Sequence, residues 1–185
     1  MKRNMFLLTV TVLMIICFVP SSVLSTQDKV TFKDGSMIFP ANDQISDLDF
    51  LLVEFDLDAP ENIPPQVRPI IGKVYRGVFG ITHAMDPKSL RGSTIYTFLT
   101  KWKGEGVEFF ASFRTRTGPR HFPMTCSLVP PKDSSVRVRC RNKWWPNQMW
   151  YLSTNEGRLF IDAENAWDAI LSEVGRIPAE YMMKK

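Results

Sequence analysis

The stretch STIYTFLTKWKGEGVEFFASFRTRTG, residues 93–118, has the pattern of a β-hairpin. Apolar and polar residues alternate on both sides of Gly104–Glu105, and a glycine in the first position of a two-residue loop favours a type II′ turn. This turn places Lys101 opposite Glu108, an attractive cross-strand pair. One face of the hairpin is then apolar: Tyr96, Phe98, Trp102, Val107, Phe109, Ala111 and Phe113. The hairpin therefore predicts an antiparallel sheet with one buried face.

The alternation continues beyond a TGPR loop into two further strands. Residues 121–129 place Phe122, Met124, Cys126 and Leu128 on the inner face, and residues 136–141 place Val136, Val138 and Cys140 there. If Leu128 lies opposite Val138, the two cysteines also lie opposite each other, and a non-hydrogen-bonded pair would bring them close enough to bond. We therefore expect a disulfide between Cys126 and Cys140. Two buried free thiols are the alternative.

Two other segments show a helical spacing of apolar residues. In residues 67–78 these recur at i, i+3, i+4, i+7, i+8 and i+11, which predicts a helix, with a strand after Gly72 as the alternative. In residues 162–178 the predicted helix has Asp162 as its N-cap and Gly175 and Pro178 at its end. Its apolar face consists of Ala163, Trp167, Ile170, Leu171 and Val174.

These elements together predict the fold class. A strand is expected over residues 52–57, and a hairpin is expected around residues 155–157. We predict an α+β fold, with a curved antiparallel sheet of about five to seven strands and one or two packed helices.

The first 25 residues resemble a secretory signal peptide in their organisation. Lys2 and Arg3 precede an apolar run over residues 6–19, and small or modest side chains allow cleavage after Ser25. A retained anchor is the alternative, although the run is shorter than the roughly 20 residues that cross a bilayer. We expect an exported protein, secreted or periplasmic, with no membrane-spanning segment after signal removal.

The remaining chain, residues 26–185, is expected to form a single domain with uneven charge. An acidic N-terminal segment (26–61) precedes a basic sheet region (62–150), and a final hairpin and helix follow (151–185). Residues 28–61 contain nine acids and two lysines, whereas residues 62–150 contain 15 basic residues and four acids. The two parts could lie against each other, or the basic part could meet an anionic partner.

The basic residues are the main candidates for binding, because arginine donates paired hydrogen bonds to phosphate, sulfate and carboxylate. The expected sheet gathers them on its outer face, together with an aromatic turn: Arg114, Arg116, Arg120, His121, Arg137, Arg139, Arg141, Lys143, Trp144 and Trp145. Apolar Ile95, Leu99, Phe110 and Val129 are expected on the same face, so the acidic stretch Asp47–Glu61 could cover part of it. The alternative is that these charges only solvate the sheet, and that most tryptophans belong to the core.

Catalytic and cofactor signals are weak. With only two histidines and a pair of cysteines expected to bond, we expect no metal site and no cofactor. The sequence also lacks a phosphate-binding loop and a G-x-S-x-G motif. Glu108, His121 and nearby arginines could serve a hydrolase, but Glu108 is expected far from His121. No catalytic residue is assigned.

The leading functional hypothesis is an exported non-enzymatic binding protein that contacts a protein or an anionic polymer through its basic sheet face. One alternative is a secreted hydrolase acting on nucleic acid. Another is a small-molecule carrier with a pocket between sheet and helix. The sequence does not indicate the oligomeric state.

Overall fold

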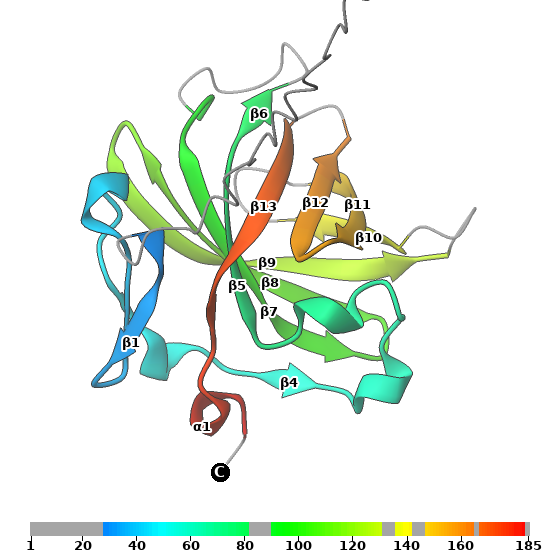
Figure 1. The fold of residues 1–185 in the computed structure, drawn as a ribbon. Coiled ribbons are helices and arrows are strands. Elements are labelled where there is room, and N and C mark those ends of the chain that lie inside the picture. The colour runs from blue at the N-terminus through cyan, green and yellow to red at the C-terminus, as the bar shows by residue number, and fades with distance from the viewer. Residues whose placement is uncertain (1–27, 82–89, 131–135, 142–146, 165–166, 184–185) are drawn as a thin grey trace, which may run out of the picture.

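The computed structural model describes residues 28–81, 90–130, 136–141, 147–164 and 167–183. Eight strands form an antiparallel barrel (Figure 1). They are β5 (Lys73–Val78), β7 (Thr94–Lys103), β8 (Gly106–Thr115), β9 (Gly118–Val129), β10 (Val136–Arg141), β11 (Gln148–Asn155), β12 (Arg158–Ala163) and β13 (Trp167–Arg176). The expected signal peptide, residues 1–25, lies outside the described residues.

Each barrel strand pairs with the next along the chain, and the last pairs with the first. β12 pairs with β13 over residues Arg158–Ala163, and β13 then pairs with β5, which closes the barrel. The prediction of an α+β fold, with a curved antiparallel sheet of about five to seven strands and one or two packed helices, is therefore wrong. In the described residues the α-helical content is one short helix, α1 (Ala179–Met182).

Both predicted helices are strands in the structure. Residues 67–78 form a 3-10 turn, η5 (Arg68–Ile70), followed by β5, so the alternative of a strand after Gly72 is correct. A Cβ atom at Gly77 would lie 2.8 Å from the carbonyl oxygen of Ile170 on β13, so glycine permits this close strand pairing. Alternate residues of β13 point inward, as the buried Leu171 and the 59%-exposed Ile170 show.

Apolar residues on both faces of β13 explain its misleading spacing. Trp167 and Leu171 point inward and pack in the interior cluster, whereas Ile170 and Val174 lie on the outward face. Val174 is buried there because the N-terminal segment packs over it, and its carbonyl oxygen accepts a hydrogen bond from the backbone N–H of Val30 at 3.2 Å. The result is a helix-like spacing of apolar residues in an extended strand.

The hairpin of β7 and β8 has the predicted turn, with Lys101 opposite Glu108. The register then shifts between Leu99 and Lys101, and the Thr100 hydroxyl at the bulge donates to the carbonyl oxygen of Glu108. Beyond it, Ile95 and Leu99 belong to the interior cluster, contrary to prediction. Tyr96 and Phe98 belong instead to the outer cluster. Both faces of β7 are buried, so the alternation of apolar and polar residues could not show which of its side chains point into the barrel.

The N-terminal strap, residues 28–57, covers one outer wall of the barrel. It contains β1 (Thr31–Lys33), β2 (Ser36–Ile38), η2 (Ala41–Asp43), β3 (Leu48–Asp49), η3 (Phe50–Leu52) and β4 (Asp56–Leu57). Phe50 packs against Phe98 on β7 with ring centroids 5.7 Å apart, and Figure 1 shows the strap outside the barrel strands in blue and cyan. The expected strand over 52–57 is thus confined to its last two residues.

One end of the barrel is closed by the chain that enters β5. Residues 59–72 include η4 (Pro60–Asn62) and η5, and their Ile63, Val67 and Ile70 belong to the interior cluster. The hairpin of β11 and β12, predicted around residues 155–157, turns at this capped end, where the Thr154 hydroxyl donates to the carbonyl oxygen of Gln66 at 2.9 Å. At the opposite end, β5 is followed by β6 (Gly80–Ile81), and β8 turns into β9.

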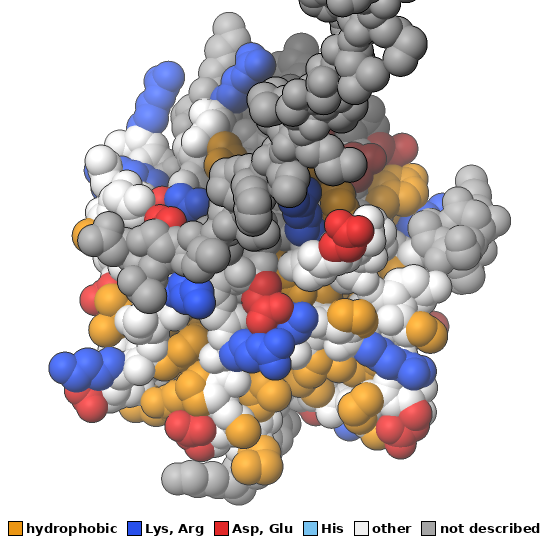
Figure 2. Space-filling model, viewed as in Figure 1, with side chains coloured by type: hydrophobic (Ala, Val, Ile, Leu, Met, Phe, Trp, Pro, Cys, Tyr) orange, Lys and Arg blue, Asp and Glu red, His pale blue; other side chains and the backbone are white. Residues whose placement is uncertain are grey.

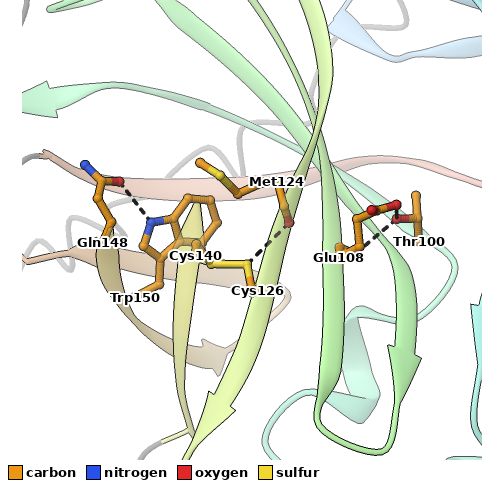
Figure 3. Close-up of a disulfide and its surroundings, with 7 residues drawn as sticks. All are labelled: Thr100, Glu108, Met124, Cys126, Cys140, Gln148 and Trp150. Carbon is orange, nitrogen blue, oxygen red and sulfur yellow. Dashed lines mark hydrogen bonds between the residues drawn. A yellow bond between two sulfur atoms is a disulfide. The ribbon is translucent and has the colours of Figure 1, made fainter. Parts of the chain in front are cut away.

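The disulfide prediction is confirmed. Cys126 on β9 and Cys140 on β10 are directly opposed and bonded, with Cα atoms 4.0 Å apart. Leu128 lies opposite Val138, as the predicted register requires. Figure 3 shows the bridge near Trp150 in the barrel interior.

We expect the variant Cys126→Ala/Cys140→Ala to lose stability. The bridge closes a loop with a sequence separation of 14, and a loop of about 15 residues corresponds to roughly 3 kcal/mol in the chain-entropy model. Urea unfolding of the variant and the oxidised protein measures the difference. Equal midpoints and equal slopes would show that the bridge does not constrain the unfolded chain.

Candidate functional site

Four arginines lie at the barrel end opposite the cap, which we call the arginine end. They are Arg91 in the turn before β7, Arg114 near the end of β8, Arg116 in the β8–β9 turn and Arg120 at the start of β9. Ile95 pairs with Phe113, and Phe113 pairs with Arg120, so these segments are neighbours. Figure 2 shows Lys and Arg side chains toward the upper left, where Figure 1 draws the hairpin of β8 and β9.

Two of these arginines are held by hydrogen bonds. Arg114 donates to the backbone carbonyl of Gln44 in the strap at 2.9 Å, and Arg120 donates to the carbonyl of Pro119 at 2.8 Å. None of the four forms an ion pair with another residue in the described ranges. Their positive charges are therefore not neutralised within the described part of the protein.

The other predicted binding residues do not join this group. Arg139 and Arg141 are exposed on β10, and Arg141 lies opposite Thr125 on β9. Five residues separate Thr125 from Arg120 on β9, roughly 17 Å of extended chain. The expected continuous basic face is thus divided into two groups. Lys143, Trp144 and Trp145 lie outside the described residues.

Arg137 does not point freely to solvent, although it was expected on the outer face. It is only 8% exposed, and its guanidinium donates to the carbonyl oxygen of Pro130. A substitution here would leave that acceptor without its donor, so Arg137 helps to hold the end of β9 beside β10.

His121 links the barrel to the strap. Its Nε2 lies 3.2 Å from the Ser46 hydroxyl, and its Nδ1 lies 3.0 Å from the hydroxyl of Ser112 on β8. Its ring stacks on Phe39 with centroids 6.0 Å apart. Burial lowers the pKa of His121, although a strap hydrogen bond at Ser46 opposes this effect. The neutral imidazole is therefore favoured.

A second link joins Asp43 of the strap to the barrel wall. The Asp43 carboxylate accepts two hydrogen bonds from Arg76, at 2.7 and 3.0 Å, and another from the Tyr96 hydroxyl. Burial alone would raise the pKa of Asp43, but these hydrogen bonds and the Arg76 charge outweigh it, so the pKa lies below its usual value. Burial, together with the hydrogen bond to Asp43 and the negative charge of its carboxylate, raises the pKa of Tyr96, although Arg76 opposes this effect.

The acidic stretch Asp47–Glu61 does not cover the arginine-bearing strand β10. Its Asp56 and Asp58 form ion pairs with Lys103, at 3.9 and 3.4 Å. Asp58 also accepts a hydrogen bond from the backbone N–H of Gly104. Asp56 at the end of the strap and Asp58 just after it therefore hold this part of the chain to the β7–β8 turn at the capped end.

These positions also bear on the hydrolase hypothesis. Glu108 contacts Thr100 and pairs with Thr125, whereas His121 pairs with Ser112, four residues along β8. The separation expected between Glu108 and His121 is therefore present. Within the described ranges, no three His, Cys, Asp or Glu side chains are grouped as metal ligands.

Sequence reasoning missed Arg91, Asp43, Ser46 and Ser112. Arg91 lies in a turn 23 residues before Arg114, and only the pairing of β7 with β8 brings the two segments together. Asp43 and Ser46 meet their partners across long sequence separations. The acidic N-terminal segment and the basic sheet region indicated that the two could lie against each other. Their overall charges could not identify which residues pair.

Acidification is expected to weaken the contact of the strap with the barrel. Because the folded pKa of His121 is lowered, its protonation costs folding free energy once pH falls below the unfolded pKa of about 6.5. Thermal unfolding between about pH 8 and about pH 5 should show stability falling as pH falls. His121→Gln should reduce that slope, and an unchanged slope would contradict the assignment.

In the described part of the chain, no helix is long and apolar enough to cross a membrane. No known protein family, curated protein or solved structure matches this chain. Any functional proposal must therefore be argued from the site itself.

Proposed function

We propose that this is an exported, non-enzymatic binding protein whose arginine end binds an anionic partner. The observation that carries the proposal is the convergence of Arg91, Arg114, Arg116 and Arg120 at one barrel end, with no ion pair to any described residue. Like charges held together repel each other, and an anion relieves that repulsion.

The arrangement of these side chains supports anion binding. Arg114 and Arg120 each use part of their donors to fix the guanidinium against backbone carbonyls. An arginine has five N–H donors, so donors remain for a ligand. A guanidinium that is already fixed loses less side-chain entropy when it binds.

Export is part of the proposal. The organisation of the first 25 residues favours a signal peptide. The Cys126–Cys140 bond supports an oxidising compartment, because disulfides persist there and are rare in the cytosol.

The test is the salt dependence of binding to heparin, a polysulfated anionic polymer. Each arginine that neutralises a polymer charge adds roughly 0.7–0.9 to the slope of log affinity against log salt, by analogy with nucleic acids. We expect Arg91→Gln/Arg116→Gln/Arg120→Gln to weaken binding and flatten the slope by about 2. Arg114 is left intact because it holds the strap.

A matched control changes three arginines elsewhere. The variant Arg139→Gln/Arg141→Gln/Arg158→Gln removes the same net charge, and all three of its arginines are exposed. It should retain the steeper slope of the wild type. Equal losses in both variants would show that net charge alone attracts heparin, and binding lost only in the control would place the site on β10.

A further inference from the structure

We infer that two copies of this protein associate face to face through the outer wall that β12 and β13 form. The contact is isologous, which means that both copies contribute the same surface. It is carried by a row of outward apolar side chains that has acids on one side and an arginine on the other. The inference goes beyond anion binding and does not depend on it.

The apolar row consists of Phe160, Ile170 and Val78, on three neighbouring strands. Phe160 on β12 lies directly opposite Ile170 on β13. Val78 at the end of β5 points outward, because the adjacent Phe79 packs in the interior cluster. Ile170 is 59% exposed and Val78 is 47% exposed, and Phe160 is partly buried. None of the three belongs to either hydrophobic cluster of the described residues.

The described part of the strap does not reach the apolar row. Its contact with β13 lies farther along the strand, where the Val30 backbone N–H donates to the carbonyl oxygen of Val174. Figure 1 shows β12 and β13 to the right of the blue strap strands. A set of apolar side chains exposed together across several strands is typical of a surface that binds a partner.

Charged side chains flank the apolar row on both sides of Phe160. Arg158 and Asp162 lie two residues before and two residues after Phe160, on the same face of β12. Asp162 pairs directly with Asp168 on β13, and like charges in such a pair repel each other. All three charged side chains are exposed, and none forms an ion pair with another described residue. The two sides of the row therefore carry opposite charges that are not neutralised by described residues.

This order of charges makes the wall complementary to itself. A two-fold axis that runs along the apolar row, across the strands, reverses the strand direction of the second copy. Phe160 then faces Phe160 of the second copy, and Arg158 of each copy faces Asp162 of the other. Packed sheets are about 10 Å apart, so side chains from both walls meet between them. The arginine of the second copy also relieves the repulsion between Asp162 and Asp168.

The arrangement also determines the strength of the contact and the position of the anion sites. The wall of a barrel is convex, so the contact is small, and we expect a Kd on the order of 10–100 µM. Monomers then predominate at about 1 µM, a concentration suited to unfolding measurements. Because the strand direction is reversed, the two arginine ends lie at opposite ends of the pair, and dissociation leaves each anion site intact.

Sedimentation equilibrium of the exported, oxidised protein between about 1 and about 300 µM measures the association. We expect the wild type to change from monomer to dimer over this range. Ile170→Asp places an unpaired charge in the apolar row and should raise the Kd at least about ten-fold. Leu52→Asp is the matched control, because Leu52 is 79% exposed on the strap, and it should leave the Kd unchanged.

Charge reversal tests the two-fold arrangement. Arg158→Asp brings acids of the two copies together at both symmetry-related positions, and Asp162→Arg brings arginines together there. Each variant alone should therefore raise the Kd at least about ten-fold. An equimolar mixture of the two variants should form heterodimers with the wild-type affinity, because each charge again meets its opposite. Arg139→Asp, at an exposed position on β10, changes the net charge equally and should have no effect.

Every outcome of these measurements bears on the inference. A wild type that remains monomeric at about 300 µM would overturn it, and so would a dimer that Ile170→Asp leaves intact. Association lost in Leu52→Asp but kept in Ile170→Asp would move the contact to the strap. Charge variants that associate neither in the mixture nor as the double variant Arg158→Asp/Asp162→Arg would exclude the two-fold arrangement. Association restored in the mixture would show that both variants are folded, so that a folding defect does not explain their loss of association.

Discussion

Replacing Asp43 with alanine should destabilise the protein by about 3–5 kcal/mol, the range for removing one partner of a buried ion pair. The Asp43 side chain is 4% exposed, whereas that of Arg76 is 26% exposed, so the lower part of the range is expected. The substitution leaves the Arg76 charge and the Tyr96 hydroxyl without their common acceptor. Urea unfolding followed by tryptophan fluorescence measures the loss.

Thr94→Ala provides the control for this experiment. The Thr94 hydroxyl contacts the same Asp43 carboxylate, but at 3.4 Å, where a hydrogen bond is weak. We expect it to cost less than about 1 kcal/mol. Similar losses in Asp43→Ala and Thr94→Ala would contradict the view that the Asp43–Arg76 pair anchors the strap.

Trp150→Ala should also destabilise the protein by about 3–5 kcal/mol, because it would leave a large cavity in the barrel interior. Trp150 is 1% exposed and packs against Phe109 and Trp167, with centroids 6.0 and 5.2 Å away. Its indole N–H donates to the Gln148 side chain, as Figure 3 shows. Removal of the ring leaves that buried acceptor without a partner.

Ile170→Ala is the matched control for the loss of a large apolar side chain. Ile170 is 59% exposed on the outer wall, so its truncation should change stability by about 0.5 kcal/mol or less. If Trp150→Ala were no more destabilising than Ile170→Ala, the interior would not be packed as the structure shows.

Local patterns in the sequence were sufficient to predict the turn and the register of the central strands. The turn at Gly104–Glu105 and the Lys101–Glu108 pair were correct, because two-residue hairpins have strong local preferences. The Cys126–Cys140 register was also correct, since polar and apolar residues alternate clearly on strands with one solvated face. These features depend on residues close in sequence.

Bulges and two-sided burial explain the failures. The shift at Thr100 reverses which side chains of β7 face the interior, and apolar residues on both faces of β13 imitate a helical spacing. Closure of the barrel joins β13 to β5, and nothing local to either strand specifies that pairing. Most of the candidate site depends on the same long-range pairings, so the sequence could indicate its charge but not its division into two groups.

Nuclear magnetic resonance tests the central claim, that the arginine end is the anion-binding site, most directly. Backbone amide shifts are followed in labelled protein during titration with a short heparin oligosaccharide. We predict that the largest changes occur at residues 90–93 and 113–122, and that they diminish as salt is added. Changes centred on residues 125–127 and 139–141, or no saturable changes at low salt, would contradict the claim.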